Sequence, residues 1–109
     1  MTYEVKWTSR ALDRLRELLR LVSEDRPKTA RRLINRIFDR AQQLEEHPYL
    51  GRTFAGLPDG PIRQLTQDRY LLLYTVSEER QEVYILLVQH QREPEPDHSD
   101  LDVDPEELE

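Results

Sequence analysis

The sequence predicts a single α+β domain in which an antiparallel sheet packs against a helical hairpin, with the element order β-α-α-β-β-β. Three observations predict this class. The first residues alternate between apolar and polar side chains, and two longer segments then repeat apolar residues every three or four positions. Three short runs rich in β-branched, leucine and tyrosine residues follow. One strand, a pair of helices and a meander of three strands are typical of the α+β class.

The first predicted strand covers residues 3–7, with its apolar side chains at Tyr3, Val5 and Trp7. Thr8 or Ser9 then offers a hydroxyl group that can cap the following helix. The apolar positions of this first helix are Ala11, Leu12, Leu15, Leu18, Leu19 and Val22. Their spacing predicts an amphipathic helix with one apolar face.

The second predicted helix begins near Pro27, because proline is favoured in the first turn of a helix. Its apolar positions are Ala30, Leu33, Ile34, Ile37, Phe38, Ala41 and Leu44. Only about four residues, 23–26, separate the two helical patterns, so we expect an antiparallel helical hairpin. Pro48 is expected to end the second helix.

All three glycines of the chain lie in the irregular connection that follows Pro48. The remaining predicted strands are residues 62–66, 70–76 and 83–90. The last of these is almost continuously apolar, which predicts a central strand of the sheet. We expect the sheet face away from the helices to be partly open, because arginines lie within or beside these strands.

The composition excludes several classes of site. There is no cysteine, so disulfides and thiolate metal sites are excluded, and the three histidines are too few to predict a zinc site. We predict no metal and no cofactor. The first residues lack the apolar run of a signal peptide, and no stretch approaches the roughly 20 apolar residues that cross a bilayer. These features predict a cytoplasmic protein that does not contact membranes.

The two signs of charge are segregated along the chain. Residues 1–92 contain all 16 Lys and Arg residues with 13 acids, whereas residues 93–109 contain nine acids and no base. We therefore divide the chain into a mildly basic domain, 1–92, and an acidic tail, 93–109. The tail is too polar to repay the entropy of ordering it and is predicted to be disordered alone. It is either a solubilising extension, which we favour, or a polyanion that masks the basic domain.

Three arginines within or beside the predicted strands are candidate contact residues: Arg63, Arg69 and Arg92. A guanidinium group offers paired donors to a phosphate or a carboxylate. In the alternative interpretation, each is a surface residue that pairs with a nearby acid such as Asp68.

Two tyrosines and one histidine are the candidates for acid–base chemistry. Tyr70 and Tyr74 are four residues apart and so share one strand face, where they can stack on a planar ring or donate a proton. We favour the interpretation that they fill a half-buried sheet face. Histidine is a common residue for such chemistry, but no second histidine or carboxylate is clearly placed with His90, so a structural role is favoured.

Other arginines point to a possible partner surface. Arg32, Arg36 and Arg40 recur every four residues along what we expect to be the outer side of the second helix. Such a row is usually a solvated face, and the alternative is a docking surface for an acidic partner. Arg52 ends the connection after the second helix and is expected to brace that loop.

Four segments resemble the RelE/ParE superfamily of toxins from type II toxin–antitoxin modules. Residues 7–13 (WTSRALD) resemble the opening of the family, and 47–52 (HPYLGR) resemble its Pro-x-x-Gly-Arg connection. Residues 63–74 (RQLTQDRYLLLY) are similar to its Arg-x-Leu…Tyr-x-x-x-Tyr strand pair, and 83–92 (VYILLVQHQR) to its closing strand. The four lie in the family's order, so the chain is identified as a member of this superfamily over residues 2–92.

The resemblance implies a toxin that a cognate antitoxin neutralises, with one of two targets. RelE-like members cleave mRNA on the ribosome, whereas ParE-like members poison DNA gyrase. The Trp-Thr-x-x-Ala opening and the long helical hairpin resemble the ParE branch, and the two lysines, Lys6 and Lys28, both precede the meander. We therefore favour a ParE-like gyrase inhibitor that is not an enzyme and that reaches operator DNA only through its antitoxin.

The resemblance also implies two sets of site residues. If the chain is RelE-like, an endoribonuclease acting on ribosome-bound mRNA, its catalytic candidates are Arg63, Tyr70, His90 and Arg92. The candidates for contact with target or antitoxin are Arg32, Arg36, Arg40, Arg52, Arg63, Arg69, Tyr74 and Arg92. A third alternative is a non-toxic regulatory remnant of the fold.

Overall fold

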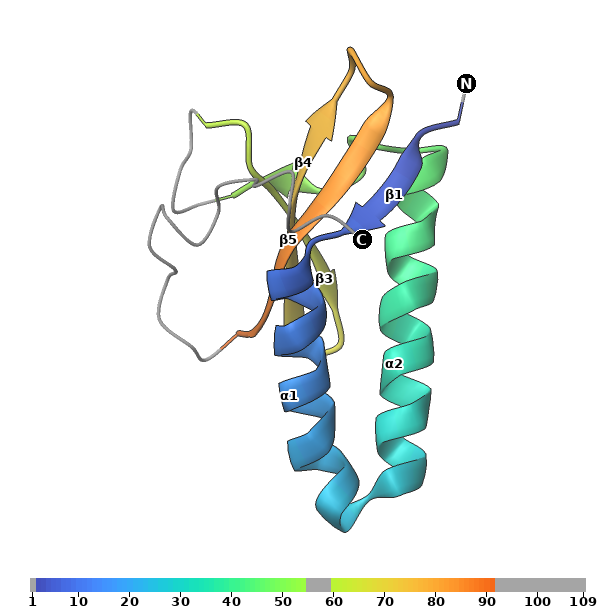
Figure 1. Cartoon of the computed structure of the whole chain (residues 1–109), viewed down its shortest axis with the longest axis vertical. Helices are drawn as coiled ribbons and strands as arrows, with labels where there is room; N and C mark the ends of the chain where they lie inside the picture. The colour runs from blue at the N-terminus through green and yellow to red at the C-terminus, as the bar shows by residue number, and fades with distance from the viewer. Residues whose placement is uncertain (1, 55–59, 92–109) are drawn as a thin grey trace.

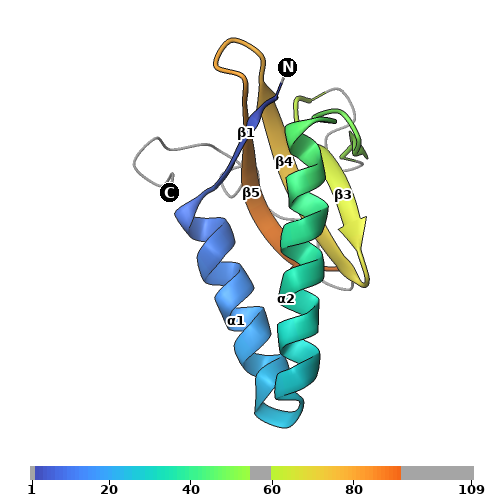
Figure 2. The same ribbon diagram turned by 90° about the vertical axis from the view of Figure 1, so that its right-hand side faces the viewer.

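The computed structural model describes residues 2–54 and 60–91. A five-stranded sheet of order β1-β5-β4-β3-β2 is covered on one face by two long helices (Figure 1 and Figure 2). The elements are β1 (Glu4–Trp7), α1 (Ser9–Asp25), α2 (Pro27–Gln42), the 3-10 helix η1 (Gln43–Glu45), β2 (Arg52–Thr53), β3 (Arg63–Gln67), β4 (Tyr70–Ser77) and β5 (Glu82–His90). The predicted α+β class and element order are confirmed, and the two-residue strand β2 is an addition.

The sheet is mixed rather than wholly antiparallel, which corrects the expected strand directions. β1 pairs in parallel with β5, in a register that sets Val5 opposite Val83. The reason is that α1 and α2 form an antiparallel hairpin, which returns the chain to the starting end of β1 (Figure 1). There the Tyr3 N–H donates to the Glu45 carbonyl oxygen at 2.7 Å. The antiparallel strands β3, β4 and β5 then leave β5 running in the direction of β1.

Thr8 joins β1 to α1 and is buried. Its hydroxyl donates to the Ile85 carbonyl oxygen at 3.0 Å, with the Leu86 carbonyl oxygen at 3.3 Å, and its N–H donates to the Ile85 oxygen at 3.1 Å. The same hydroxyl accepts from the Ala11 N–H at 3.1 Å and thereby caps α1. Thr8 is thus the helix cap, and it ties the start of α1 to the central strand.

The helical hairpin turns more sharply than the sequence pattern suggests. α1 continues to Asp25, so the single residue Arg26 separates it from α2, where about four residues were expected. The Arg26 N–H donates to the Val22 carbonyl oxygen at 3.0 Å and closes α1. Pro27 then occupies the first turn of α2, as predicted.

The strand β5 is central, as predicted, because it lies between β1 and β4. Its pairing with β4 shifts between Leu73, which is opposite Leu87, and Tyr74, which is opposite Ile85. Leu86 is therefore an extra residue, a β-bulge. Its carbonyl lies beside the Thr8 hydroxyl, so the bulge forms part of the junction with α1.

Both faces of the sheet carry apolar clusters. The cluster under the helices comprises Ala11, Leu15, Leu18, Leu33, Ile37, Ala41, Leu44, Leu65, Leu72, Tyr74, Val83, Ile85 and Val88. The cluster on the other face comprises Phe54, Ile62, Leu73, Tyr84 and Leu86. We expected this second face of the sheet to be partly open. That expectation is wrong at this cluster, because Phe54 and Ile62 pack there against the strand residues.

Candidate functional site

A groove of about 590 Å³ lies between the helical hairpin and the end of the sheet where β3 turns into β4. Figure 2 shows this turn beside the middle of α2. The groove is lined by Val22, Arg26, Thr29, Leu33, Arg36, Asp68, Arg69, Tyr70 and His90. It therefore brings Tyr70 and His90, from the set of catalytic candidates, together with Arg36 and Arg69, from the set of contact candidates.

Tyr70 and His90 form one wall of the groove. They are directly opposite each other on β4 and β5, and their rings meet edge to face with centroids 5.3 Å apart. The phenol and the imidazole are both half-buried. This pair places one phenol hydroxyl and one imidazole ring at the edge of the groove.

The turn between β3 and β4 contributes one acidic and one basic residue, Asp68 and Arg69, to the groove. Asp68 has a φ of 56°, in the left-handed region, which suits a two-residue turn with Arg69. The Arg36 Nε donates to the Asp68 carboxylate at 2.9 Å. This hydrogen bond holds the pKa of Asp68 below its usual value. Arg36 and Asp68 thereby join the middle of α2 to the sheet.

The arginine row on α2 does not lie wholly on an outer face, which corrects the sequence-based expectation. Arg36 pairs with Asp68, and Arg40 donates to the Thr66 carbonyl oxygen at 3.3 Å and to the Gln43 side chain at 2.7 Å. Only Arg32 of the three has no hydrogen bond or ion pair with another described residue. Arg36 and Arg40 of α2 therefore face β3 and the turn that follows it. The four-residue spacing of the arginines does not show which element this side of the helix faces.

Arg63 lies at the other end of the β3–β4 hairpin from Tyr70 and His90. It is opposite Tyr74, four positions along β4 from Tyr70, which is about 13 Å at the usual rise of a strand. Its Nε donates to the Gly51 carbonyl oxygen at 2.8 Å, and its guanidinium carbon is 5.3 Å from the centre of the Tyr49 ring. Arg63 thus holds the 49–51 turn against β3.

Tyr49, which lies beside Arg63, forms a further polar contact. Its hydroxyl donates to the Glu78 carboxylate, and this hydrogen bond raises the pKa of Tyr49 to about 12.

Replacement of Glu78 by glutamine is therefore expected to lower the pKa of Tyr49 towards its ordinary value. Ultraviolet titration of the phenolate measures this change, and Glu79→Gln, an exposed neighbour, is the matched control. An unchanged titration curve in Glu78→Gln would contradict the contact.

Tyr74 is completely buried and does not lie on a contact surface, which corrects its selection as a contact candidate. The interpretation of this residue as core is confirmed. Its hydroxyl accepts from the Gly51 N–H at 2.8 Å, and burial raises the pKa of the phenol. Tyr70 shares the helix-facing side of β4 with Tyr74, as predicted, but lies at the edge of the cluster beneath the helices.

The remaining candidates are separate from the groove or outside the described residues. Arg52 is exposed on β2, where both its Nη2 and Nε lie 3.2 Å from the Gln64 side-chain amide, oriented with its oxygen towards Arg52. It joins β2 to β3 in this way. Arg92 and the acidic tail, 93–109, lie outside the described residues, so the division into domain and tail stays a prediction.

The sequence analysis missed the helical part of the groove. Val22, Arg26, Thr29 and Leu33 come from the hairpin end of α1 and α2. The one signal that could have found them was the short helix connection, which brings Arg26 next to both helices. Their proximity to the β3–β4 turn depends on how the hairpin crosses the sheet.

Within residues 2–54 and 60–91, no helix is long and apolar enough to cross a membrane. No group of three or more histidine, cysteine or acidic residues in this part of the chain is arranged to hold a metal ion.

Comparisons with known proteins agree with the fold and the motifs. A chain in the crystal structure of the toxin–antitoxin complex RelBE2 from Mycobacterium tuberculosis aligns with a TM-score of 0.59 at 23% sequence identity. The alignment covers 83% of this chain and 99% of that chain. A search of curated proteins finds no match. The fold is that of a RelE/ParE superfamily toxin.

The family itself follows from the sequence match. The family described as the ParE toxin of the type II toxin–antitoxin system parDE matches residues 5–95. The chain therefore belongs to the ParE toxin family of type II toxin–antitoxin systems.

Proposed function

We propose that this protein inhibits DNA gyrase as a ParE-like toxin and that a cognate antitoxin neutralises it. The observation that carries the proposal is the match to the ParE toxin family over residues 5–95. The target of the toxin is our inference from this family and from the geometry of the basic residues.

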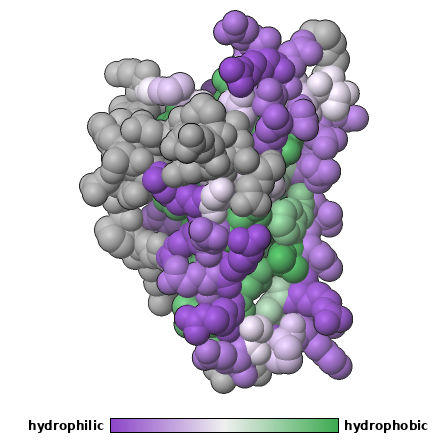
Figure 3. Space-filling view, viewed as in Figure 1, coloured by the Kyte–Doolittle hydropathy of each residue, from purple (hydrophilic) through white to green (hydrophobic). Residues whose placement is uncertain are grey.

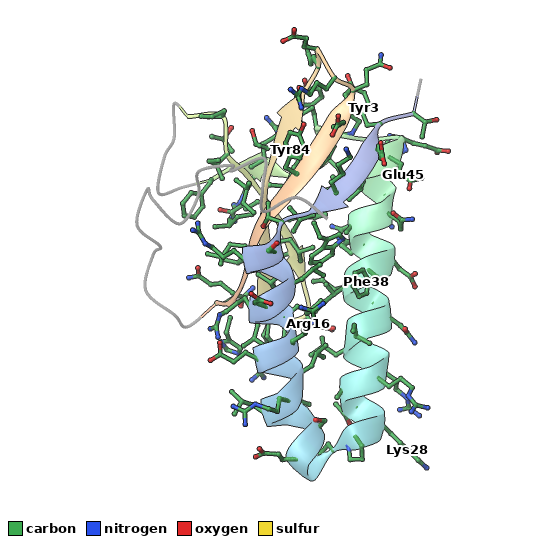
Figure 4. The ribbon with its side chains drawn as sticks, viewed as in Figure 1. Tyr3, Arg16, Lys28, Phe38, Glu45 and Tyr84 are labelled. Carbon is green, nitrogen blue, oxygen red and sulfur yellow. The ribbon has the colours of Figure 1, made fainter. Side chains whose placement is uncertain are left out.

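The placement of Arg63 and of the two lysines supports gyrase over mRNA as the target. A RelE-like nuclease needs its arginines and its acid–base groups around one phosphate. Here the Arg63 guanidinium donates a hydrogen bond to the Gly51 carbonyl oxygen. Arg63 lies about 13 Å along the hairpin from Tyr70. Lys6 pairs with Glu82 at 2.9 Å, and Lys28 points away from the hairpin (Figure 4). Neither lysine lines the groove.

A surface between the helices supports neutralisation by an antitoxin. Figure 3 shows a strip of hydrophobic surface between purple, hydrophilic side chains, over the two helices of Figure 1. Trp7, Leu19, Ile34 and Phe38 are partly buried apolar side chains that pack against the cluster under the helices, and the Trp7 and Phe38 rings are 4.8 Å apart. An amphipathic antitoxin segment can bury such a strip. Operator DNA would be reached through the antitoxin.

The test combines toxicity with a direct assay of the target. Expression should arrest growth, and co-expression of the adjacent small gene should restore it and yield a co-purifying complex. The purified chain should trap gyrase–DNA cleavage complexes and leave ribosome-bound mRNA intact. Absence of growth arrest, with a folded chain, would favour the non-toxic remnant instead.

Substitutions in the groove separate the two targets. Tyr70→Phe and His90→Gln are expected to leave growth arrest nearly unchanged, because gyrase inhibition requires no acid–base step from these groups. If the chain instead cleaves mRNA, loss of general acid–base catalysis should reduce cleavage by about 10²–10⁴-fold. The Tyr70–His90 pair beside Arg36 and Arg69 is the observation that keeps this second function in view. Codon-dependent cleavage on ribosomes that these variants abolish would overturn the gyrase proposal.

A further inference from the structure

The groove beside Tyr70 and His90 has an excess of positive charge. Arg26, Arg36 and Arg69 line it, and Asp68 is the single acid among its lining residues. Asp68 is already bound to Arg36, whereas Arg26 and Arg69 form no ion pair with another described residue. Val22 and Leu33 add an apolar floor. This combination fits an extended acidic peptide that also carries a few apolar side chains.

The described chain ends at the rim of this groove. His90 lines it, and the next residue, Gln91, donates its N–H to the Arg69 carbonyl oxygen at 2.9 Å. Residue 93 is therefore within about 11 Å of His90, since each residue spans at most about 3.6 Å. The acidic tail that begins there has nine acids, no base, and the apolar residues Leu101, Val103 and Leu108.

We propose that residues 93–109 bind in this groove as an intramolecular acidic ligand, with carboxylates on Arg26 and Arg69. Covalent attachment at the rim gives the tail an effective concentration on the order of millimolar. Even a weak intrinsic affinity is then enough to fill the groove. An acidic partner or a nucleic acid that uses the same arginines must displace the tail first. This regulatory consequence rests on the proposed function, but the binding of the tail does not.

Nuclear magnetic resonance of the isolated full-length chain tests the contact directly. Wild type is compared with a tail-neutral variant in which all nine acids from Glu93 to Glu109 become the corresponding amides. The backbone amide signals of Thr29, Leu33 and Arg69 are expected to differ between the two proteins. The differences should vanish in about 1 M salt, where the Debye length falls to about 3 Å. Cell-free synthesis of the labelled chains avoids any effect on growth.

Groove variants supply the second arm. Arg26→Gln/Arg69→Gln should give wild-type tail and tail-neutral chains the same groove signals. Arg20→Gln/Arg31→Gln removes two exposed helical arginines outside the groove and should leave the difference intact. A labelled octaglutamate peptide should bind the tail-neutral chain about tenfold more tightly than wild type, for a tail affinity of about 0.1 mM. The groove variant should abolish that binding.

Two outcomes would overturn the proposal. The first is a set of signal differences confined to residues 89–109 at low salt. The second is a groove whose signals ignore the tail but move on addition of a short oligonucleotide, which would assign the groove to phosphate. Neither outcome involves gyrase or an antitoxin, so failure of this proposal is distinguishable from failure of the proposed function.

Discussion

Replacement of Gly51 by alanine is expected to destabilise the protein by about 3 kcal/mol, because the site has no room for a side chain. A Cβ at this position would collide with the Gln64 backbone oxygen and lie 2.8 Å from the Tyr74 hydroxyl. The Gly51 N–H also donates to that hydroxyl, and its carbonyl accepts from Arg63. Urea denaturation should show a midpoint lowered by about 2 M with an unchanged m value.

A second substitution identifies which contact causes the loss. Tyr74→Phe removes the hydroxyl but leaves the backbone of β3 in place. If the collision with the Gln64 carbonyl dominates, Gly51→Ala/Tyr74→Phe should be no more stable than Gly51→Ala. Full recovery in the double variant would assign the cost to the hydroxyl instead. Gly51→Ala with wild-type stability would show that the turn moves freely away from β3.

Replacement of Thr8 by valine is expected to cost about 2–3 kcal/mol, from a lost helix cap and a lost buried hydrogen bond. Valine has nearly the same shape as threonine, with a methyl group in place of the hydroxyl, so the substitution removes only the hydrogen bonds of that hydroxyl. That hydroxyl caps α1 through the Ala11 N–H and donates to the Ile85 carbonyl oxygen at the bulge in β5. The junction between the first helix and the central strand is therefore expected to loosen. The difference in free energy of unfolding is measured by urea denaturation.

Thr8→Ser is the matched control for this prediction. It keeps the hydroxyl and removes one methyl group, so the expected cost is no more than about 1 kcal/mol. Equal losses in the serine and valine variants would mean that packing of the methyl group, not hydrogen bonding, makes this position sensitive.

Local sequence patterns were sufficient to predict the main helices and strands and to identify the superfamily. The alternation of Tyr3, Val5 and Trp7 and the apolar spacing of both helices each depend on residues within two turns or one strand. Pro27 and Thr8 marked helix starts because capping is a local hydrogen-bonding requirement. The four motifs identified the superfamily for the same reason, since each is a short segment of sequence.

The candidate site was predicted residue by residue but not as a site. Tyr70 and His90 were selected in one set with Arg63, which lies at the far end of the hairpin. Arg36 and Arg69, which do line the groove, were selected in a different set. Tyr74 was chosen as a surface contact and is buried. The exposure of a strand residue depends on which elements cover that strand, and periodicity gives only its face.

The sequence alone determined the order and type of every element except η1 and β2, the central place of β5, the capping of the first helix and the separation of charge. These properties follow from backbone propensity, apolar periodicity and composition, which act over a few neighbouring residues. Only the tertiary structure decided the parallel pairing of β1 with β5, the bulge at Leu86, the lean of Arg36 and Arg40 against β3 and the groove beside His90. These depend on contacts between residues about 10 to 80 positions apart, whose geometry is set when the hairpin packs on the sheet and buries its apolar face.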